Sequence, residues 1–178
     1  MAGRIVPLLS LFCGAGGLDE GLRQVRHVAF RTMLAVDIKT SAVATFRANH
    51  PGATVLQLDL SQVSESDLIS HWESVLPHSG PAGIIGGPPC QSFSVANVHK
   101  KDNDPRDDLP QDYCRILGAF HQRYGLDFFL FENVPGLLSQ RHRARFESFI
   151  NQCTELGFTV TYDTLDAVAF GVPQYRKR

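Results

Sequence analysis

The chain has 178 residues, of which 43% are hydrophobic and 20% are charged, so it can bury a core of ordinary size. This composition excludes a disordered tail, a collagen-like fibre and a disulfide-stabilised miniprotein. A net charge of −1 gives no overall basic signature, so basic groups that bind nucleic acid must be local or come from a partner.

Short apolar runs alternate with longer amphipathic ones, which indicates strands alternating with helices. Strands are predicted, in chain order, at residues 5–12, 30–36, 54–58, 83–85, 128–131 and 158–165, and a further one begins at residue 170. Helices are predicted between them at residues 18–25, 40–49, 64–76, 112–124 and 141–156, and the pattern Ser64-x-x-Asp67 is typical of a helix start. The pattern predicts an α/β fold with a doubly wound, mostly parallel sheet that is covered on both faces.

The polar stretch between Pro89 and Pro110 is typical of a functional loop or lid, because structureless segments of that length are uncommon inside a compact domain. The four cysteines form no C-x-x-C pair and the seven histidines show no ligand spacing, so we expect reduced thiols and no metal. No apolar run approaches the ~20 residues of a membrane span. We therefore expect no membrane partner and an intracellular protein, cytoplasmic and nucleoid-associated if bacterial, or nuclear if eukaryotic.

Four chemically capable side chains directly follow predicted strands: Asp37, Asp59, Cys90 and Glu132. In open parallel sheets, ligands bind beyond the carboxyl ends of the strands. The sequence therefore predicts a functional site at that edge of the sheet.

The glycine-rich turn FCGAGG, from Phe12 to Gly17, joins the first strand to the first helix and lets the backbone pass close to a ligand. Asp37 lies twenty positions after Gly17 at a strand end, where a carboxylate can bind ribose hydroxyls. Asp59 at the next strand end could accept from an adenine amino group. The pattern favours a nucleoside cofactor over a tight turn without a ligand, but it does not separate NAD from S-adenosylmethionine.

The segment GGPPCQSFS presents Cys90 after a strand that ends in two glycines and two prolines. A cysteine there is a candidate nucleophile if a nearby group favours its thiolate, although a lone cysteine is more often an inert buried residue.

Glu132 ends the apolar strand FFLFEN, and its partial burial would suit a group that both donates and accepts a proton. The alternative is a carboxylate that caps a loop or is simply paired with an arginine. The closing segment VPQYRKR, if it is a strand, places Gln174, Arg176 and Arg178 on one face, whereas an isolated segment of this kind would be a solvated basic terminus.

Taken together, these segments resemble the DNA (cytosine-5) methyltransferase family. LFCGAGGLDEGL is similar to its cofactor motif, GGPPCQSFS to its nucleophile motif, and FENVPGLL and QYRKR to its carboxylate and arginine motifs, in the family's order. The resemblance extends from Ser10, where many relatives have an acidic residue, to Arg178.

The resemblance implies that residues 1–178 form a catalytic domain that binds S-adenosylmethionine and methylates a cytosine flipped out of duplex DNA. It implies that Cys90, Glu132, Arg176 and Arg178 are catalytic. The residues it implies for the cofactor are Phe12, Gly14, Ala15, Gly16, Gly17, Leu18, Asp37, Ile38, Asp59, Leu60 and Pro89. Those it implies for the DNA substrate are Gln91, Ser94, Arg106, Asn133 and Gln174.

The family's usual enzyme also carries a target-recognition domain and a closing segment that completes the cofactor site. Neither is found in this sequence, which predicts a sheet incomplete at its C-terminal end and a shortened chain, a gene remnant, or one polypeptide of a split enzyme. The alternatives are a tRNA-directed relative and a non-catalytic subunit with the same fold. A dehydrogenase is disfavoured, because it would leave Cys90, Glu132 and the arginines without a joint role.

Overall fold

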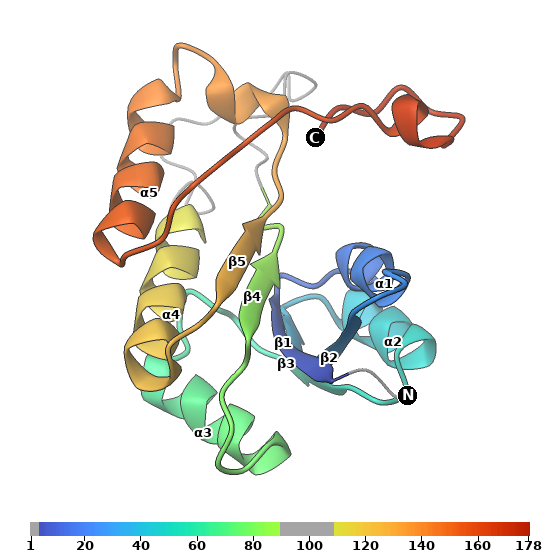
Figure 1. Ribbon diagram of the computed structural model, residues 1–178, viewed down its shortest axis with the longest axis vertical. Helices are drawn as coiled ribbons and strands as arrows, with labels where there is room; N and C mark the ends of the chain where they lie inside the picture. The colour runs from blue at the N-terminus through green and yellow to red at the C-terminus, as the bar shows by residue number, and fades with distance from the viewer. Residues whose placement is uncertain (1–3, 90–108) are drawn as a thin grey trace. The chain divides into compact units, whose positions relative to one another are not determined.

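The computed structural model describes residues 4–89 and 109–178 (Figure 1). Its internal contacts divide the chain into two compact units. The first unit combines residues 1–87 with 115–131, and the second combines residues 88–114 with 132–178.

The first unit is built on a five-stranded sheet in the order β3-β2-β1-β4-β5. Its strands are β1 (Ile5–Leu11), β2 (Ala29–Asp37), β3 (Thr54–Gln57), β4 (Gly83–Gly86) and β5 (Phe128–Phe131). Every pair of neighbouring strands is parallel. The predicted doubly wound parallel sheet is therefore confirmed, and the five strands predicted between residues 5 and 131 lie within a residue or two of their expected bounds.

Helices cover both faces of this sheet, as parallel strands require. Its helices are α1 (Gly17–Arg23), α2 (Thr40–Asn49), α3 (Glu65–Val75) and, from Arg115 onward, α4 (Leu109–Tyr124). Figure 1 shows α1 and α2 on one side of the strands and α3 and α4 on the other. Phe46 of α2 is fully buried in a cluster with Cys13 and Val55, and Trp72 of α3 is equally buried.

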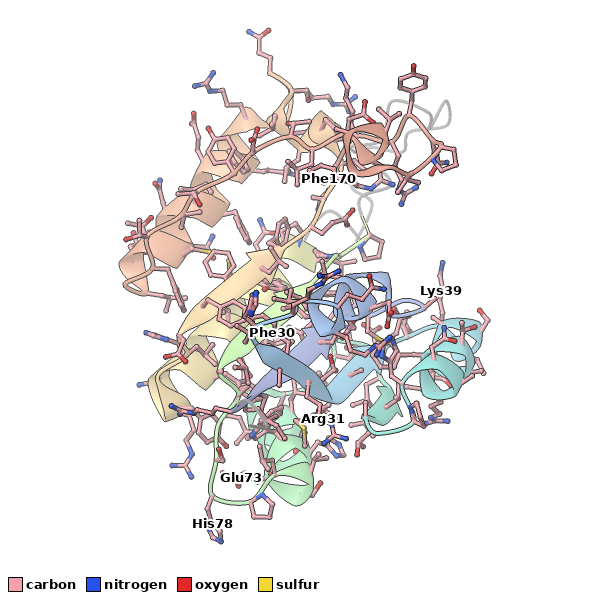
Figure 2. All side chains as sticks on the ribbon, turned by 45° about the vertical axis from the view of Figure 1, so that its right-hand side comes forward. Phe30, Arg31, Lys39, Glu73, His78 and Phe170 are labelled. Atoms are coloured by element: carbon pink, nitrogen blue, oxygen red, sulfur yellow. The ribbon has the colours of Figure 1, made fainter. Side chains whose placement is uncertain are left out.

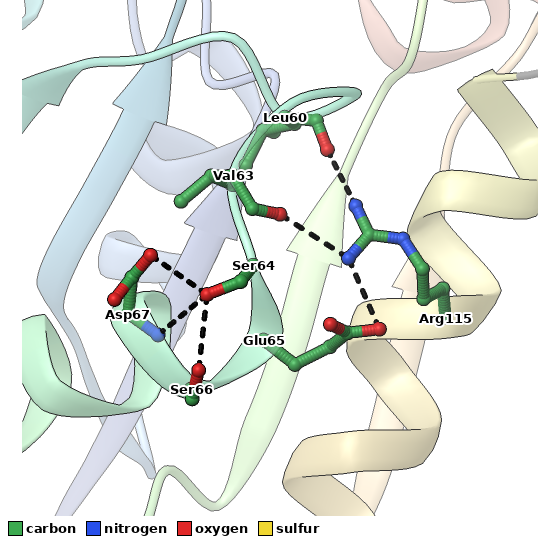
Figure 3. A network of polar contacts seen from close by, with 7 residues as sticks. All are labelled: Leu60, Val63, Ser64, Glu65, Ser66, Asp67 and Arg115. Carbon is green, nitrogen blue, oxygen red and sulfur yellow. Dashed lines mark hydrogen bonds and ion pairs between the residues drawn. The ribbon is translucent and has the colours of Figure 1, made fainter.

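The start of α3 was predictable from Ser64 because the capping interaction is local. The Ser64 Oγ accepts a hydrogen bond of 3.1 Å from the Asp67 amide, which is the usual role of a helix N-cap (Figure 3). At the other end of the helix, the Trp72 Nε1–H donates to the carbonyl of Ser79 at 2.7 Å. These two bonds fix the α3 segment that leads from β3 to β4.

The second unit contains the first turns of α4, a 3₁₀ helix η2 (Pro135–Leu138), α5 (Arg143–Glu155) and a 3₁₀ helix η3 (Ala167–Phe170). Helix α5 packs on the start of α4. The Sγ atoms of Cys114 and Cys153 lie 3.8 Å apart, and the Tyr113 and Phe149 rings have centroids 6.3 Å apart. Both cysteines are buried thiols, as expected for cysteines on helices.

The predicted strand at residues 158–165 is wrong, and so is the strand predicted to begin at residue 170. Residues 158–165 are irregular, and Tyr162 packs edge-to-face on Phe146 of α5 with 4.8 Å between ring centroids. Two backbone hydrogen bonds of 2.8 and 2.9 Å join Leu165 to Arg178, and only Asp166 and Lys177 form a β-bridge. A strand needs a neighbour along its whole length, but the pairing with residues 176–178 covers residues 165–167 and so reaches only the last residue of the segment 158–165.

No helix among residues 4–89 and 109–178 is long and apolar enough to cross a membrane. Within the same residues, no group of three or more His, Cys, Asp or Glu side chains is placed to hold a metal ion.

Candidate functional site

The glycine-rich turn follows β1 in a conformation that few residues adopt. Phe12, Gly14 and Gly16 all have positive φ angles, of 50°, 54° and 88°. Within the turn the Gly16 amide donates to the carbonyl of Cys13 at 3.0 Å. A β-carbon built on Gly14 or Gly17 would meet no atom within 4 Å, so the backbone at both positions faces open space. This is the geometry needed for close approach of a ligand.

Asp37, the last residue of β2, binds the glycine turn directly. Its Oδ2 accepts a hydrogen bond of 2.9 Å from the Gly14 amide, and its Oδ1 accepts one of 2.8 Å from the Lys39 amide. A carboxylate has about four acceptor positions, so further hydroxyl donors can still be accommodated. The neighbouring Ile38 is 55% exposed although its side chain is large and apolar. The side chain of Lys39 points away from the protein (Figure 2).

Asp59 and Leu60 lie in the connection between β3 and α3. The Asp59 Oδ1 accepts hydrogen bonds from the Ser61 amide and hydroxyl at 3.0 and 2.7 Å. Arg115 of α4 fastens this connection by donating to the carbonyls of Leu60 and Val63 at 2.7 and 3.2 Å (Figure 3). Asp59 is therefore half-buried on a connection that Arg115 stabilises through hydrogen bonds.

Phe12 and Leu18 at the ends of the turn are half-buried, Ala15 is exposed, and Leu60 is buried. In the first unit, the structure thus brings the predicted turn and Asp37 together through a direct hydrogen bond, and it places Asp59 one strand further along the sheet.

In the second unit, Glu132 and Arg178 form an ion pair. The Arg178 Nε and the Glu132 Oε1 are 2.8 Å apart, and the two side chains are 30% and 39% exposed. Glu132 directly follows β5, whereas Arg178 is positioned by the antiparallel bonds between residues 165–167 and 176–178. Two residues predicted to be catalytic, and distant in sequence, therefore meet.

The other described residues of the predicted substrate and catalytic sets lie in the same unit. The Asn133 Oδ1 accepts from the Val134 amide at 2.7 Å, and its buried Nδ2 has no partner among the described residues. Arg176 and Gln174 are exposed, and the Arg176 amide donates to Asp166 Oδ1 at 3.0 Å. Pro89 is exposed. Cys90, Gln91, Ser94 and Arg106 lie outside the described residues.

Sequence reasoning missed two residues, Asp19 and His50, that pack against the segment containing the glycine turn. The Asp19 carboxylate, on α1, is buried against hydroxyls of β1 and β2. The imidazole of His50 covers Gly16, where a β-carbon would overlap its Nε2 atom. The available signal was the pair of hydroxyl residues, Ser10 and Thr32, within the predicted strands at residues 5–12 and 30–36.

The fold and the position of these residues define an α/β protein with a candidate site at the carboxyl ends of parallel strands. Comparison with known proteins makes the class specific. The family model for C-5 cytosine-specific DNA methylases matches residues 6–178. The chain belongs to that family.

Two curated relatives and one solved structure illustrate the similarity. The chain is 36% identical over 173 residues to the Type II methyltransferase M.NgoPII of Neisseria gonorrhoeae, covering 97% of this chain and 46% of the relative. It is 33% identical over 180 residues to M.AquIA of a Picosynechococcus species, covering 96% of this chain and 68% of that relative. A prophage-encoded E. coli protein, described as a DNA modification methyltransferase, matches with a TM-score of 0.74 at 29% identity, covering 97% of this chain and 44% of that one.

The chain therefore spans about half the length of most of these relatives. Membership of a methyltransferase family implies a methyl donor for the reaction.

Proposed function

We propose that this chain supplies the cofactor-binding and catalytic portion, residues 1–178, of a DNA cytosine-5 methyltransferase. The observation that carries the proposal is the ion pair between Glu132 and Arg178, at 2.8 Å. In this pair, the Glu132 carboxyl group can hydrogen-bond N3 and the exocyclic amine of cytosine, and the Arg178 guanidinium can donate to O2. The Type II methyltransferases among its relatives support DNA as the substrate.

We propose S-adenosylmethionine as the methyl donor, because the first unit offers what this molecule needs. The open backbone at Gly14 and Gly17 would accommodate its methionine part, and Asp37 would accept from its ribose hydroxyls. The exposed Ile38 offers an apolar surface for the adenine ring, and Asp59 a carboxylate for its amino group. When bound, S-adenosylmethionine supplies a methyl group made electrophilic by a positively charged sulfur.

The remaining members of the predicted cofactor set are Phe12, Ala15, Gly16, Leu18, Leu60 and Pro89. We assign those of the first unit to the walls of this site, whereas Pro89, in the second unit, remains a predicted cofactor contact.

The cytosine must leave the DNA stack, since its ring carbons cannot be reached inside a duplex. The Cys90 thiolate would then add to ring carbon 6, and the displaced electron pair makes carbon 5 nucleophilic. Glu132 would hydrogen-bond N3 and the exocyclic amine, which stabilises the charge created by that addition. Once carbon 5 is methylated, loss of its proton restores the double bond and releases Cys90.

Arg178 would contact the ring O2 and so fix the orientation of the base, with Arg176 supporting the same wall. We assign DNA contacts to Gln91, Ser94, Arg106, Asn133 and Gln174.

We further propose that another polypeptide segment, in the same protein or a second chain, covers the C-terminal part of the second unit and carries target recognition. Large apolar side chains are exposed along residues 162–175, where Phe170 and Tyr175 are 69% and 88% exposed. Figure 2 labels Phe170. Isolated exposed apolar residues are ordinary, but several along one short segment mark an interaction surface. The greater length of M.NgoPII fits this arrangement.

The test is transfer of a labelled methyl group from S-adenosylmethionine to duplex DNA, using the chain alone and the complex purified natively from its source. Glu132→Gln should lower the rate at least about 100-fold, because a preorganised group that stabilises developing charge is removed. Cys90→Ser should abolish transfer and leave cofactor affinity largely intact.

The matched control is Glu147→Gln, which breaks an exposed ion pair with Arg143 of the same 2.8 Å length in the same unit. This control should retain activity. Methylation of tRNA in place of DNA would favour the tRNA-directed alternative, and absence of transfer to any nucleic acid would favour a non-catalytic subunit.

A further inference from the structure

A buried carboxylate lies directly behind the glycine-rich turn. Asp19 is 3% exposed, although aspartate is rarely buried without a charged partner. Its Oδ2 accepts a hydrogen bond of 3.1 Å from the Ser10 hydroxyl, and its Oδ1 accepts one of 2.6 Å from the Thr32 hydroxyl. The three side chains come from α1, β1 and β2, so one carboxylate joins three elements of the first unit.

These bonds bracket the turn. Ser10 lies two residues before Phe12, and Asp19 lies two residues after Gly17. The hydrogen bond between Ser10 and Asp19 therefore closes a loop that contains the whole turn. Strand β2 makes two further hydrogen bonds to this region: Thr32 donates to Asp19, and Asp37 accepts from the amide of Gly14.

A buried carboxylate at position 19 is not expected to stabilise the fold more than an apolar side chain would. Burial raises the pKa of Asp19 above its usual 3.8, so the ionised form is disfavoured in the fold despite its two hydroxyl donors. A positive charge on His50, whose ring lies over Gly16, would oppose this shift. Buried charged groups of this kind are often no better for stability than apolar residues of the same size, and their contribution can instead be to specify one geometry.

We propose that Asp19 is a positioning residue that, by accepting from Ser10 and Thr32, fixes the Phe12–Gly17 turn in the conformation that binds S-adenosylmethionine. The inference rests on the proposed function, because it concerns the same cofactor site. Asp19 itself touches no ligand in this account. It acts on the open backbone of Gly14 and Gly17 through the two ends of the turn.

The test measures binding of S-adenosylmethionine and of S-adenosylhomocysteine by calorimetry. Asp19→Ala removes both bonds and should raise the Kd for each about tenfold, since misplacing a binding element by even ~1 Å has large effects. Asp19→Asn keeps one acceptor and adds a donor that a hydroxyl can accept, so it should restore binding to within about threefold of wild type. In steady-state assays, Asp19→Ala should raise KM for S-adenosylmethionine about tenfold and change kcat by less than about threefold.

The matched control is Leu68→Ala, which leaves a cavity at a fully buried position of α3. It should lower stability without a comparable change in Kd. If Asp19→Ala does not fold, Ser10→Ala removes the 3.1 Å bond alone and should weaken binding about threefold.

Each other result overturns the proposal. Equal losses of affinity in Leu68→Ala and Asp19→Ala at equal loss of stability would make Asp19 merely structural. An Asp19→Asn variant as weak as Asp19→Ala would show that the charge acts rather than the geometry. Failure of the wild-type protein to bind S-adenosylmethionine would instead refute the proposed function. The two failures are therefore distinguishable, because the results above concern only the variants.

Discussion

Replacing Gly16 with alanine is expected to lower the free energy of unfolding through two separate effects. Gly16 has a φ of 88°, and an L-residue in the left-handed region costs about 1–2 kcal/mol. The new β-carbon would also overlap the Nε2 of His50 and lie 2.7 Å from its Cδ2 and 3.1 Å from the Cδ2 of Phe46. Overpacking of this kind costs about 1–3 kcal/mol.

The His50 ring has little freedom to move away. It packs on Phe46 with 4.4 Å between ring centroids and 34° between ring planes, and Phe46 is fully buried. We therefore expect Gly16→Ala to lose about 2–5 kcal/mol in all. Adding His50→Ala should relieve the overlap, so that the double variant is less destabilised than the sum of the two single variants.

The assay is equilibrium unfolding in urea, monitored through Trp72. The control is Gly21→Ala, in helix α1 directly after the turn, whose β-carbon would meet no atom within 4 Å. It should gain about 0.5–1 kcal/mol, because alanine is the better helix former. A loss below about 0.5 kcal/mol for Gly16→Ala, or additive effects with His50→Ala, would refute the reasoning.

Three further predictions concern single groups. Burial, with the charges of Asp37 and Asp19, raises the pKa of Cys13 to about 12, so iodoacetamide at pH 8 should not alkylate it until the protein unfolds; equal labelling before and after urea would contradict this. Arg115→Lys keeps the charge but loses the fork that binds Leu60 and Val63, and should cost about 1–2 kcal/mol in urea unfolding; an unchanged midpoint would argue against that brace. The pKa of Asp19 is raised above 3.8 in the fold, so the contribution of Asp19 to stability is lost as pH rises through the raised value. The stability of Asp19→Asn relative to wild type should therefore increase from pH 4 to pH 7. A stability difference that stays constant with pH would contradict this.

The parts of the fold that depend on local signals were predictable from sequence. Apolar periodicity located the five strands of the sheet, and the Ser64 cap located the start of α3. The segment 158–165 has the same alternating pattern, yet its pairing depends on residues 176–178 and covers only the region from Leu165 to Ala167. A pattern of alternation gives the faces of a strand but not the neighbour that would complete it.

The site shows the same division. Strand ends placed Asp37 at the carboxyl edge, and motifs singled out Glu132 and Arg178, but no local pattern gives the bond from Asp37 to Gly14 or the 2.8 Å ion pair. The cluster of Ser10, Asp19 and Thr32 was missed because each residue is ordinary by itself. Its meaning depends on three elements brought together by folding.

The account rests most directly on covalent catalysis at a cytosine, and one measurement tests it. Duplex DNA with 5-fluorocytosine in place of cytosine would be incubated with S-adenosylmethionine and the natively purified protein, and the digest analysed by mass spectrometry. Fluorine at carbon 5 cannot leave as a proton does, so the adduct to the Cys90 thiolate should persist, carry a methyl group, and be strongly reduced in Glu132→Gln. Methylated product from ordinary DNA without any adduct at Cys90, or an adduct on another residue, would contradict the account.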